Sequence, residues 1–228
     1  MRNWLVNIYT LYFYIMCFFL KNIKIERCKF ILAQVKVLGV NRVEFNDSYI
    51  NKSSLCVSGN NNNVKIGGEV YSCNIKIIGN NNTCIIESDS KIYNSNLIIR
   101  GNGCLFRFGK KSTIASAHLV CMGKDNSLIV GQECMISDNV NIWNSDSHPI
   151  IDKQSSDIIN PSSPIIIGNH VWIGKNSSIL KGSVINDGTV VGMNSLVKGH
   201  LERESVYAGN PIKKIRTGIA WNRCYISI

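Results

Sequence analysis

The chain has 228 residues, 45% of them apolar, which suits one domain with appendages and excludes global disorder. Its 25 lysines and arginines outnumber its 15 acidic residues, so the net charge is +10 at pH 7. This balance favours polyanionic partners such as an acidic glycan, an anionic membrane surface or the phosphates of a cofactor. Because no arginine-rich arm or nucleic-acid motif accompanies the charge, nucleic acid is not expected as a partner.

The N-terminal segment, residues 1–29, differs in composition from the rest of the chain. Residues 4–20 are apolar and aromatic, interrupted only by Asn7 and Thr10, and a basic stretch follows them. The run is shorter than the roughly 20 residues that span a bilayer, and no signal-peptide cleavage site follows it. It is an interfacial anchor, a short spanning helix with its basic flank inside, or a segment that packs on the rest of the protein. We favour association with the inner face of the cell membrane, where the basic stretch meets anionic lipid.

The nine cysteines do not form a disulfide framework. Their number is odd, their spacing is irregular, and no CxxC pair occurs. Cys84, Cys104, Cys121 and Cys134 lie in apolar stretches, where cysteine acts as a small core residue. The sequence therefore predicts reduced thiols in a cytoplasmic protein.

A loose repeat occupies the first half of the chain. Its four blocks share an apolar pair, a glycine and a polar turn, and their first glycines lie 20, 22 and 22 residues apart at Gly59, Gly79, Gly101 and Gly123. A three-sided coil of hexapeptides needs about 18 residues, so each block predicts one coil with an enlarged corner. The Asn runs at 60–63 and 80–82 suit such corners, because Asn and Gly tolerate left-handed backbone angles.

A strict six-residue repeat follows in residues 165–197. Its large apolar members are Ile167, Ile173, Ile179, Ile185, Val191 and Val197. Four residues after each of the first five comes a smaller one: Val171, Ser177, Ser183, Thr189 and Ser195. Neither a helix nor a simple alternating strand has this period, which is typical of a hexapeptide β-helix. The sequence predicts an all-β, three-sided parallel β-helix over residues 30–197, with one large and one small side chain of each hexad inside.

Two segments break the repeat. Residues 149–164 contain three prolines and no hexad, which predicts a loop that protrudes from the solenoid. Such loops often carry function. Residues 198–228 lose the repeat again and contain several basic residues, which predicts a C-terminal cap.

Of the four histidines, His148 is the candidate for chemistry. A single histidine is ordinarily a structural residue. His118 and His200 have no acid or motif beside them, and His170 lies at a predicted corner, where a polar residue is expected. His148 stands where the solenoid opens, within the polar run 144–149. No pair of histidines and no Cys/His cluster has the spacing of metal ligands, so no metal is expected.

Trp172 can be placed by counting along its strand. Val171 and Ile173 are predicted to point inward, so Trp172 between them faces outward. An exposed aromatic residue of this size packs against another subunit or contacts a substrate. Both hold if the site lies at a subunit interface.

The hexad run IIIGNHVWIGKNSSILKGSVINDGTVVGMNSLV, with 144–150 before it and 209–213 after it, resembles the left-handed β-helix hexapeptide acyltransferases. Among these it is most similar to the bacterial polysaccharide O-acetyltransferases, including those that modify sialic-acid capsules. The resemblance covers about residues 130–217, with Ile212 where the family usually has Ala. It implies a left-handed parallel β-helix, a homotrimer, and acetyl-CoA bound in grooves between subunits.

The resemblance also implies roles for individual residues. His148 matches the catalytic base, while Asn144 and Asp146 match polar residues that orient its ring or hold the acceptor. Trp143 and Trp172 are candidates for lining the groove. The positions matching the path of coenzyme A are Lys175, Met193, Lys198, Lys213 and Arg216. For the last two, a solvated basic tail is the alternative.

The sequence thus favours an acetyl-CoA-dependent O-acetyltransferase that modifies a sugar of a capsule, O-antigen or exopolysaccharide by direct transfer. N-acetylation of an amino sugar, or acetylation of a small antibiotic, is the alternative reaction. A non-catalytic β-helix scaffold is the alternative of another class.

Overall fold

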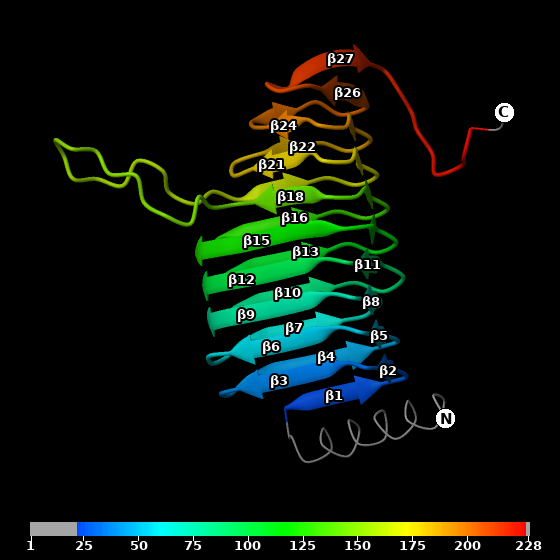
Figure 1. The fold of residues 1–228 in the computed structure, drawn as a ribbon, viewed down its shortest axis with the longest axis vertical. Helices are drawn as coiled ribbons and strands as arrows, with labels where there is room; N and C mark the ends of the chain where they lie inside the picture. Colours follow the sequence, from blue (N-terminus) through cyan, green and yellow to red (C-terminus); the bar gives the residue numbers. More distant parts are fainter. Residues whose placement is uncertain (1–21, 227–228) are drawn as a thin grey trace.

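A computed structural model describes residues 22–226, which form a long three-sided solenoid of stacked coils (Figure 1). Each coil gives one strand to each of three sheets, called A, B and C in the order in which the chain meets them. No helix occurs among the described residues, so none there is long and apolar enough to cross a membrane. The apolar run 4–20 lies outside the described residues.

From β1 to β26, successive strands belong to sheets A, B and C in rotation. Sheet A contains β1 (Ile23–Glu26), β4 (Arg42–Asn46), β7 (Asn63–Ile66), β10 (Thr83–Ile86), β13 (Leu105–Phe108), β16 (Ser127–Val130), β19 (Ile165–Ile167), β22 (Val184–Ile185) and β25 (His200–Leu201). Sheet B contains β2 (Lys29–Ile31), β5 (Tyr49–Asn51), β8 (Glu69–Tyr71), β11 (Lys91–Tyr93), β14 (Thr113–Ile114), β17 (Met135–Ile136), β20 (Trp172–Ile173), β23 (Val190–Val191), β26 (Ser205–Ala208) and β27 (Lys213–Thr217). Sheet C contains β3 (Gln34–Leu38), β6 (Ser54–Ser58), β9 (Asn74–Asn80), β12 (Asn96–Asn102), β15 (Ala117–Lys124), β18 (Val140–Trp143), β21 (Ser178–Leu180) and β24 (Leu196–Val197).

The hexads build the core as predicted. The six large residues from Ile167 to Val197 are at most 1% exposed, and the five smaller ones are buried beside them. The buried hydroxyls are satisfied by backbone carbonyls of a neighbouring turn, as when Ser177 Oγ donates to Gly192 O at 3.0 Å and Thr189 Oγ1 donates to Glu202 O at 2.8 Å. The small residue thus closes a narrow corner without leaving an unpaired polar group. These findings confirm the three-sided β-helix.

The longer coils of the first half have a wider core and polar corners. Phe30, Phe45, Phe106 and Phe108 fill the interior there, each at most 2% exposed. The predicted Asn corners are confirmed, and their buried members form a ladder between coils. In this ladder the backbone nitrogen and the Nδ2 of Asn62 both donate to Asn41 Oδ1, and the backbone nitrogen of Asn82 donates to Asn62 Oδ1. The cysteines predicted in the core are also buried, and every described cysteine is a free thiol.

A column of glycines lines the corner between sheets C and A. Gly59, Gly79 and Gly101 have φ angles of +114°, +117° and +148°, a region that side chains rarely adopt. A Cβ atom at each would overlap the carbonyl oxygen of the glycine one coil further along the chain. These glycines are therefore required by both the backbone conformation and the close stacking of the coils.

The solenoid extends beyond the expected limits of 30–197 at both ends. It begins at β1, whose residues already pair in parallel with β4. At the other end, β25 and β26 continue sheets A and B after the hexads have ended. Only β27 breaks the pattern, because it pairs antiparallel with β26 and closes the end of the coil. The expected loop protrudes far to one side of the solenoid, between β18 and β19 (Figure 1).

Candidate functional site

The protruding loop leaves the corner between sheets C and A as two antiparallel arms. Ile151 and Ile158 form an antiparallel bridge, and the Ile159 amide donates to Ile150 O at 2.9 Å. These four isoleucines are all more than half exposed. Isoleucine rarely gathers on a free surface in this number, so the loop presents an apolar face that suits contact with another surface.

An ionic anchor fixes the root of the loop. Asp146 accepts from Lys181 Nζ at 2.5 Å and from Asn160 Nδ2 at 2.9 Å, and Lys181 also donates to Asn160 O. The Lys181 ammonium, with the Asn160 amide, holds the pKa of Asp146 below its usual range. The carboxylate therefore stays charged at any pH above its ordinary pKa of about 3.9, and the anchor is lost only when acid titrates it.

His148 is held by its backbone while its ring stays exposed. Its amide donates to Asp146 O at 2.8 Å, and its carbonyl accepts from Asn160 Nδ2 at 2.9 Å. Within residues 22–226 the imidazole makes no hydrogen bond or ion pair. The ring is thus placed by a fixed backbone and is free to accept a proton from a bound molecule.

Asn144 and Asp146 occupy different environments although both precede His148. Asn144 is fully buried, its Oδ1 accepts from the Met122 amide at 2.8 Å, and its Nδ2 donates to Ser127 O at 3.2 Å. It closes the corner from which the loop starts and has no open side towards an acceptor. Asp146 is exposed and touches the anchor, so it positions the loop that carries His148.

Trp143 lies on the outward face of sheet C beside the loop root. It packs edge-on against His118 with ring centroids 5.0 Å apart, and its indole Nε1 is buried without a partner among the described residues. It also lines a small cavity of about 270 Å³, together with Leu180, Lys181 and Asp146. The predicted groove residue Trp143 therefore does lie next to the loop anchor.

Trp172 faces outward as predicted, with 38% of its surface exposed, on sheet B. The C-terminal tail brings a second indole to it, because Trp221 lies 5.9 Å from Trp172 and stacks on His170 at 4.0 Å. Trp221 Nε1 also donates to His170 O at 3.0 Å. Sequence reasoning missed Trp221, since a lone tryptophan in a polar tail carries no periodic signal.

The same tail continues down the corner between sheets A and B. Arg223 donates to Thr113 Oγ1 at 2.9 Å and to backbone carbonyls including Cys134 O at 2.6 Å. A guanidinium satisfies several carbonyls at once because its donors lie in one rigid plane. The tail therefore straps the last coil to the middle of the solenoid and holds Trp221 against Trp172.

The five residues predicted to bind the cofactor are all exposed, but within one chain they lie at three separate places on the solenoid. Lys175 and Met193 lie on consecutive coils at the corner between sheets B and C. Lys198 lies at the corner between sheets C and A, close enough to Asp146 to lower its pKa. Lys213 and Arg216 lie on β27, beside sheet B.

His148 and Trp172 lie on opposite sides of the coil. The loop leaves the corner between sheets C and A, while Trp172 projects from sheet B, the side of the triangle opposite that corner. Figure 1 shows the loop and the sheet B strands on opposite sides of the solenoid. A single chain therefore cannot bring these two residues to one site.

The contribution of the Lys181–Asp146 ion pair to holding the loop can be tested by removing the lysine, and its partial exposure limits the expected effect. Exposed ion pairs contribute about 0.2–1 kcal/mol, so Lys181→Met is expected to raise the rate of proteolysis within residues 149–159 by about 1.4- to 5-fold near neutral pH. Lys214→Met, which removes an ion pair to Glu202 far from the loop, is the control. Equal cleavage of the two variants would show that Lys181 does not hold the loop.

Within residues 22–226 there is no group of three or more His, Cys, Asp or Glu side chains placed to hold a metal ion. The groups that the candidate residues offer are an exposed imidazole, an anchored carboxylate and three tryptophans.

Comparison with known proteins agrees with the β-helix fold. The family described as bacterial transferase hexapeptide (six repeats) matches residues 164–199. A polysialic acid O-acetyltransferase of Neisseria meningitidis is 36% identical over 59% of this chain and 63% of its own length. One of Escherichia coli O1:K1 is 36% identical over 50% of this chain and 37% of its own length. These matches thus span less than two thirds of each relative.

The likeness of fold extends further than the likeness of sequence. The solved structure of the polysialic acid O-acetyltransferase OatWY is 27% identical and covers 89% of this chain and 92% of that chain, with a TM-score of 0.71. Residues 164–199 of this chain thus resemble the bacterial transferase hexapeptide repeats, and its sequence and β-helix fold are similar to those of polysialic acid O-acetyltransferases.

Proposed function

We propose that this protein is an acetyl-CoA-dependent O-acetyltransferase that acts on a hydroxyl of a surface polysaccharide. The observation that carries the proposal is His148, an exposed imidazole on an anchored loop root, within a chain that resembles polysialic acid O-acetyltransferases. The excess of positive charge suits both coenzyme A and an acidic glycan.

The chemistry requires one base. The unprotonated ring of His148 takes the proton from the acceptor hydroxyl as its oxygen attacks the thioester carbonyl. The carbon–sulfur bond then breaks, and the coenzyme A thiolate receives that proton from the imidazolium. General base catalysis of this kind is worth about 10²- to 10⁴-fold in rate. No covalent enzyme intermediate is needed, because the transfer is direct.

A complete site requires a second copy of the chain. His148 and Trp172 lie on opposite sides of one coil, and the exposed isoleucines of the loop suit contact with a neighbour. In a cyclic trimer, the loop of one copy reaches sheet B of the next, where Trp172 and Trp221 line the groove. Lys175 and Met193 border the path of the pantetheine arm, and Lys213 and Arg216 meet the phosphates.

The place of action proposed is the cytoplasmic face of the cell membrane. The free thiols of the described cysteines suit a reducing compartment, and the exposed Arg27 and Lys29 follow the apolar N-terminal segment in the sequence. Fractionation of cells that express the full chain tests this location: recovery in the membrane fraction is expected, and recovery wholly in the soluble fraction would refute it.

The reaction is tested by acceptor-dependent release of coenzyme A from acetyl-CoA. The acceptors are sialic-acid polymers, neutral glycans, amino-sugar nucleotides and chloramphenicol-type drugs. Release with an acidic polysaccharide supports the proposal, and release only with an amino sugar or a drug replaces it with the alternative reaction. A protein that neither binds acetyl-CoA nor releases coenzyme A with any acceptor is a scaffold.

A further inference from the structure

The outward face of sheet B carries three tyrosines on neighbouring coils below the loop. Tyr49, Tyr71 and Tyr93 lie on β5, β8 and β11, are half-buried, and are called the tyrosine ridge here. The rings of Tyr71 and Tyr93 pack edge-on at 6.3 Å. Tyr71 and Tyr93 lie opposite each other in the strand register, and Tyr49 lies opposite Glu69 on the neighbouring coil. Partly exposed aromatic rings offer flat apolar surfaces with polar edges, which suit the faces of sugar rings.

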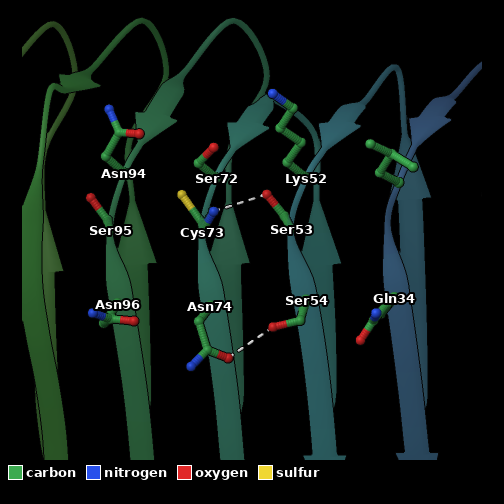
Figure 2. Close-up of a pocket in the computed structure, with 11 residues that line it drawn as sticks. Gln34, Lys52, Ser53, Ser54, Ser72, Cys73, Asn74, Asn94, Ser95 and Asn96 are labelled. Atoms are coloured by element: carbon green, nitrogen blue, oxygen red, sulfur yellow. Dashed lines mark hydrogen bonds between the residues drawn. The ribbon is translucent and has the colours of Figure 1, made fainter.

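Two grooves flank the tyrosine ridge. One, of about 620 Å³, lies at the corner between sheets A and B and includes Tyr49, Glu69 and Lys91 in its lining. The other, of about 600 Å³, lies at the corner between sheets B and C (Figure 2). Its lining includes a row of amide and hydroxyl side chains, one per coil, namely Gln34, Ser54, Asn74 and Asn96, and a second row made of Leu32, Lys52, Ser72 and Asn94.

The polar side chains of the second groove leave many groups for a ligand. Ser54 Oγ donates to Asn74 Oδ1 at 2.9 Å, as Figure 2 shows, which leaves the two amide hydrogens of Asn74 without a protein acceptor among the described residues. Amides and hydroxyls repeated at the spacing of the coils suit a ligand that itself repeats. A polysaccharide is such a ligand.

The charge of the tyrosine ridge is positive once its ion pairs are counted. Arg27 pairs with Asp47, and Lys91 pairs with Glu69. Lys29 and Lys52, by contrast, make no ion pair within residues 22–226, and each ammonium lies 5.7 Å from a tyrosine ring centroid, at Tyr49 and Tyr71 respectively. These two exposed cations are free to pair with carboxylates of a ligand.

The tyrosine ridge lies on the same sheet face as the candidate site. Strand register runs without a break from Trp172 through Met135, Thr113, Lys91 and Glu69 to Tyr49. At about 4.8 Å per strand, Tyr71 lies roughly 19 Å and Tyr49 roughly 24 Å from Trp172 along the coil axis. A chain of several sugars can therefore reach from the ridge to the site.

From these observations we propose that the tyrosine ridge and its flanking grooves bind the part of an acidic polysaccharide that lies several sugars away from the reacting hydroxyl. Tyr71 and Tyr93 stack on sugar rings, Lys29 and Lys52 pair with carboxylates, and the amides of the second groove bind hydroxyls. This inference rests on the proposed function. Binding at the tyrosine ridge would give long acidic acceptors a lower KM than short ones.

The test compares long and short acceptors in variants of the ridge. The double variant Tyr71→Leu, Tyr93→Leu is expected to raise the KM for an acidic sialic-acid polymer about 5-fold or more and to leave kcat unchanged. The rise in KM corresponds to the loss of about 1 kcal/mol from the contacts between the tyrosine rings and the sugars. The KM for a two-sugar acceptor stays the same, since it does not reach the ridge. Tyr71→Phe with Tyr93→Phe keeps the rings and is expected to keep the KM.

Charge is tested separately. Lys52→Gln is expected to raise the polymer KM and to weaken its dependence on salt. Lys76→Gln, on the outward face of sheet C, is the matched control and is expected to change neither. An unchanged polymer KM in both the leucine and the Lys52 variants, or an equal rise for the two-sugar acceptor, would overturn the inference.

A binding assay separates this inference from the proposed function. Fluorescent sialic-acid polymer is titrated onto the full chain carrying His148→Ala, with dextran of equal length as the neutral probe. The acidic polymer is expected to bind more tightly than dextran, and the two leucine substitutions are expected to weaken it about 5-fold. If no acceptor is ever acetylated but this difference holds, only the proposed reaction fails. If the leucine variant binds like its parent, the ridge proposal fails.

Discussion

Replacing His148 with alanine is expected to lower the rate of acetyl transfer by about 10²- to 10⁴-fold and to leave the thermal unfolding midpoint unchanged. The loss follows from removing the one imidazole that is held by its backbone and has no partner for its ring in the described part of the chain. The fold is spared because the side chain is exposed and packs against nothing buried. Steady-state release of coenzyme A and circular dichroism melting measure the two effects.

His200→Ala is the matched control for this substitution. His200 is also exposed and lies on β25, just after the corner between sheets C and A two coils further on, where its ring bonds to Asn186 Nδ2. Its loss is expected to change transfer less than 2-fold. If His148→Ala kept more than a tenth of the wild-type rate, His148 would not be the base.

Gly79→Ala is expected to lower the free energy of unfolding by about 4 kcal/mol or more, among the largest effects of a single substitution. Gly79 has a φ angle of +117°, and a Cβ there would overlap the Gly101 carbonyl oxygen of the next coil. Backbone strain alone accounts for about 1–3 kcal/mol. The remainder arises because two coils in hydrogen-bonded register cannot separate locally without breaking strand pairs.

Gly199→Ala separates the two causes. Gly199 has a similar φ of +100°, but a Cβ there meets no atom within 4 Å. It is expected to cost only the backbone strain, about 1–3 kcal/mol. Thermal or denaturant unfolding of the two variants measures the difference, and equal losses would show that coil stacking does not require the glycine column.

The core of this protein could be predicted from the sequence because it is built from local repeats. The hexad that begins at Ile173 and contains Ser177 places its side chains by strand alternation and a tight corner, both of which depend only on neighbouring residues. The Asn corners were predictable for the same reason, since Asn and Gly are chosen for backbone angles. The loop at 149–164 was visible as the place where the repeat stops.

Contacts between distant segments could not be predicted in this way. Trp221 and Arg223 bind coils 51 and up to 112 residues earlier in the chain, through a tail that has no period. In the sequence Asn144 looks like another polar residue beside His148, but in the structure it occupies the inward position after β18 and is buried. The first coil, at β1, was not recognised because its sequence is basic, and in the structure Lys24, Arg27 and Lys29 face outward.

Complementation between two inactive variants tests the central claim most directly, namely that one site joins His148 of one copy to Trp172 of another. His148→Ala and Trp172→Ala chains are each expected to be inactive or nearly so alone. Co-expressed in equal amounts, they are expected to recover about a quarter of wild-type coenzyme A release, because about a quarter of sites in mixed trimers combine both intact residues. Activity no higher than that of the two variants measured separately would contradict a site shared between copies.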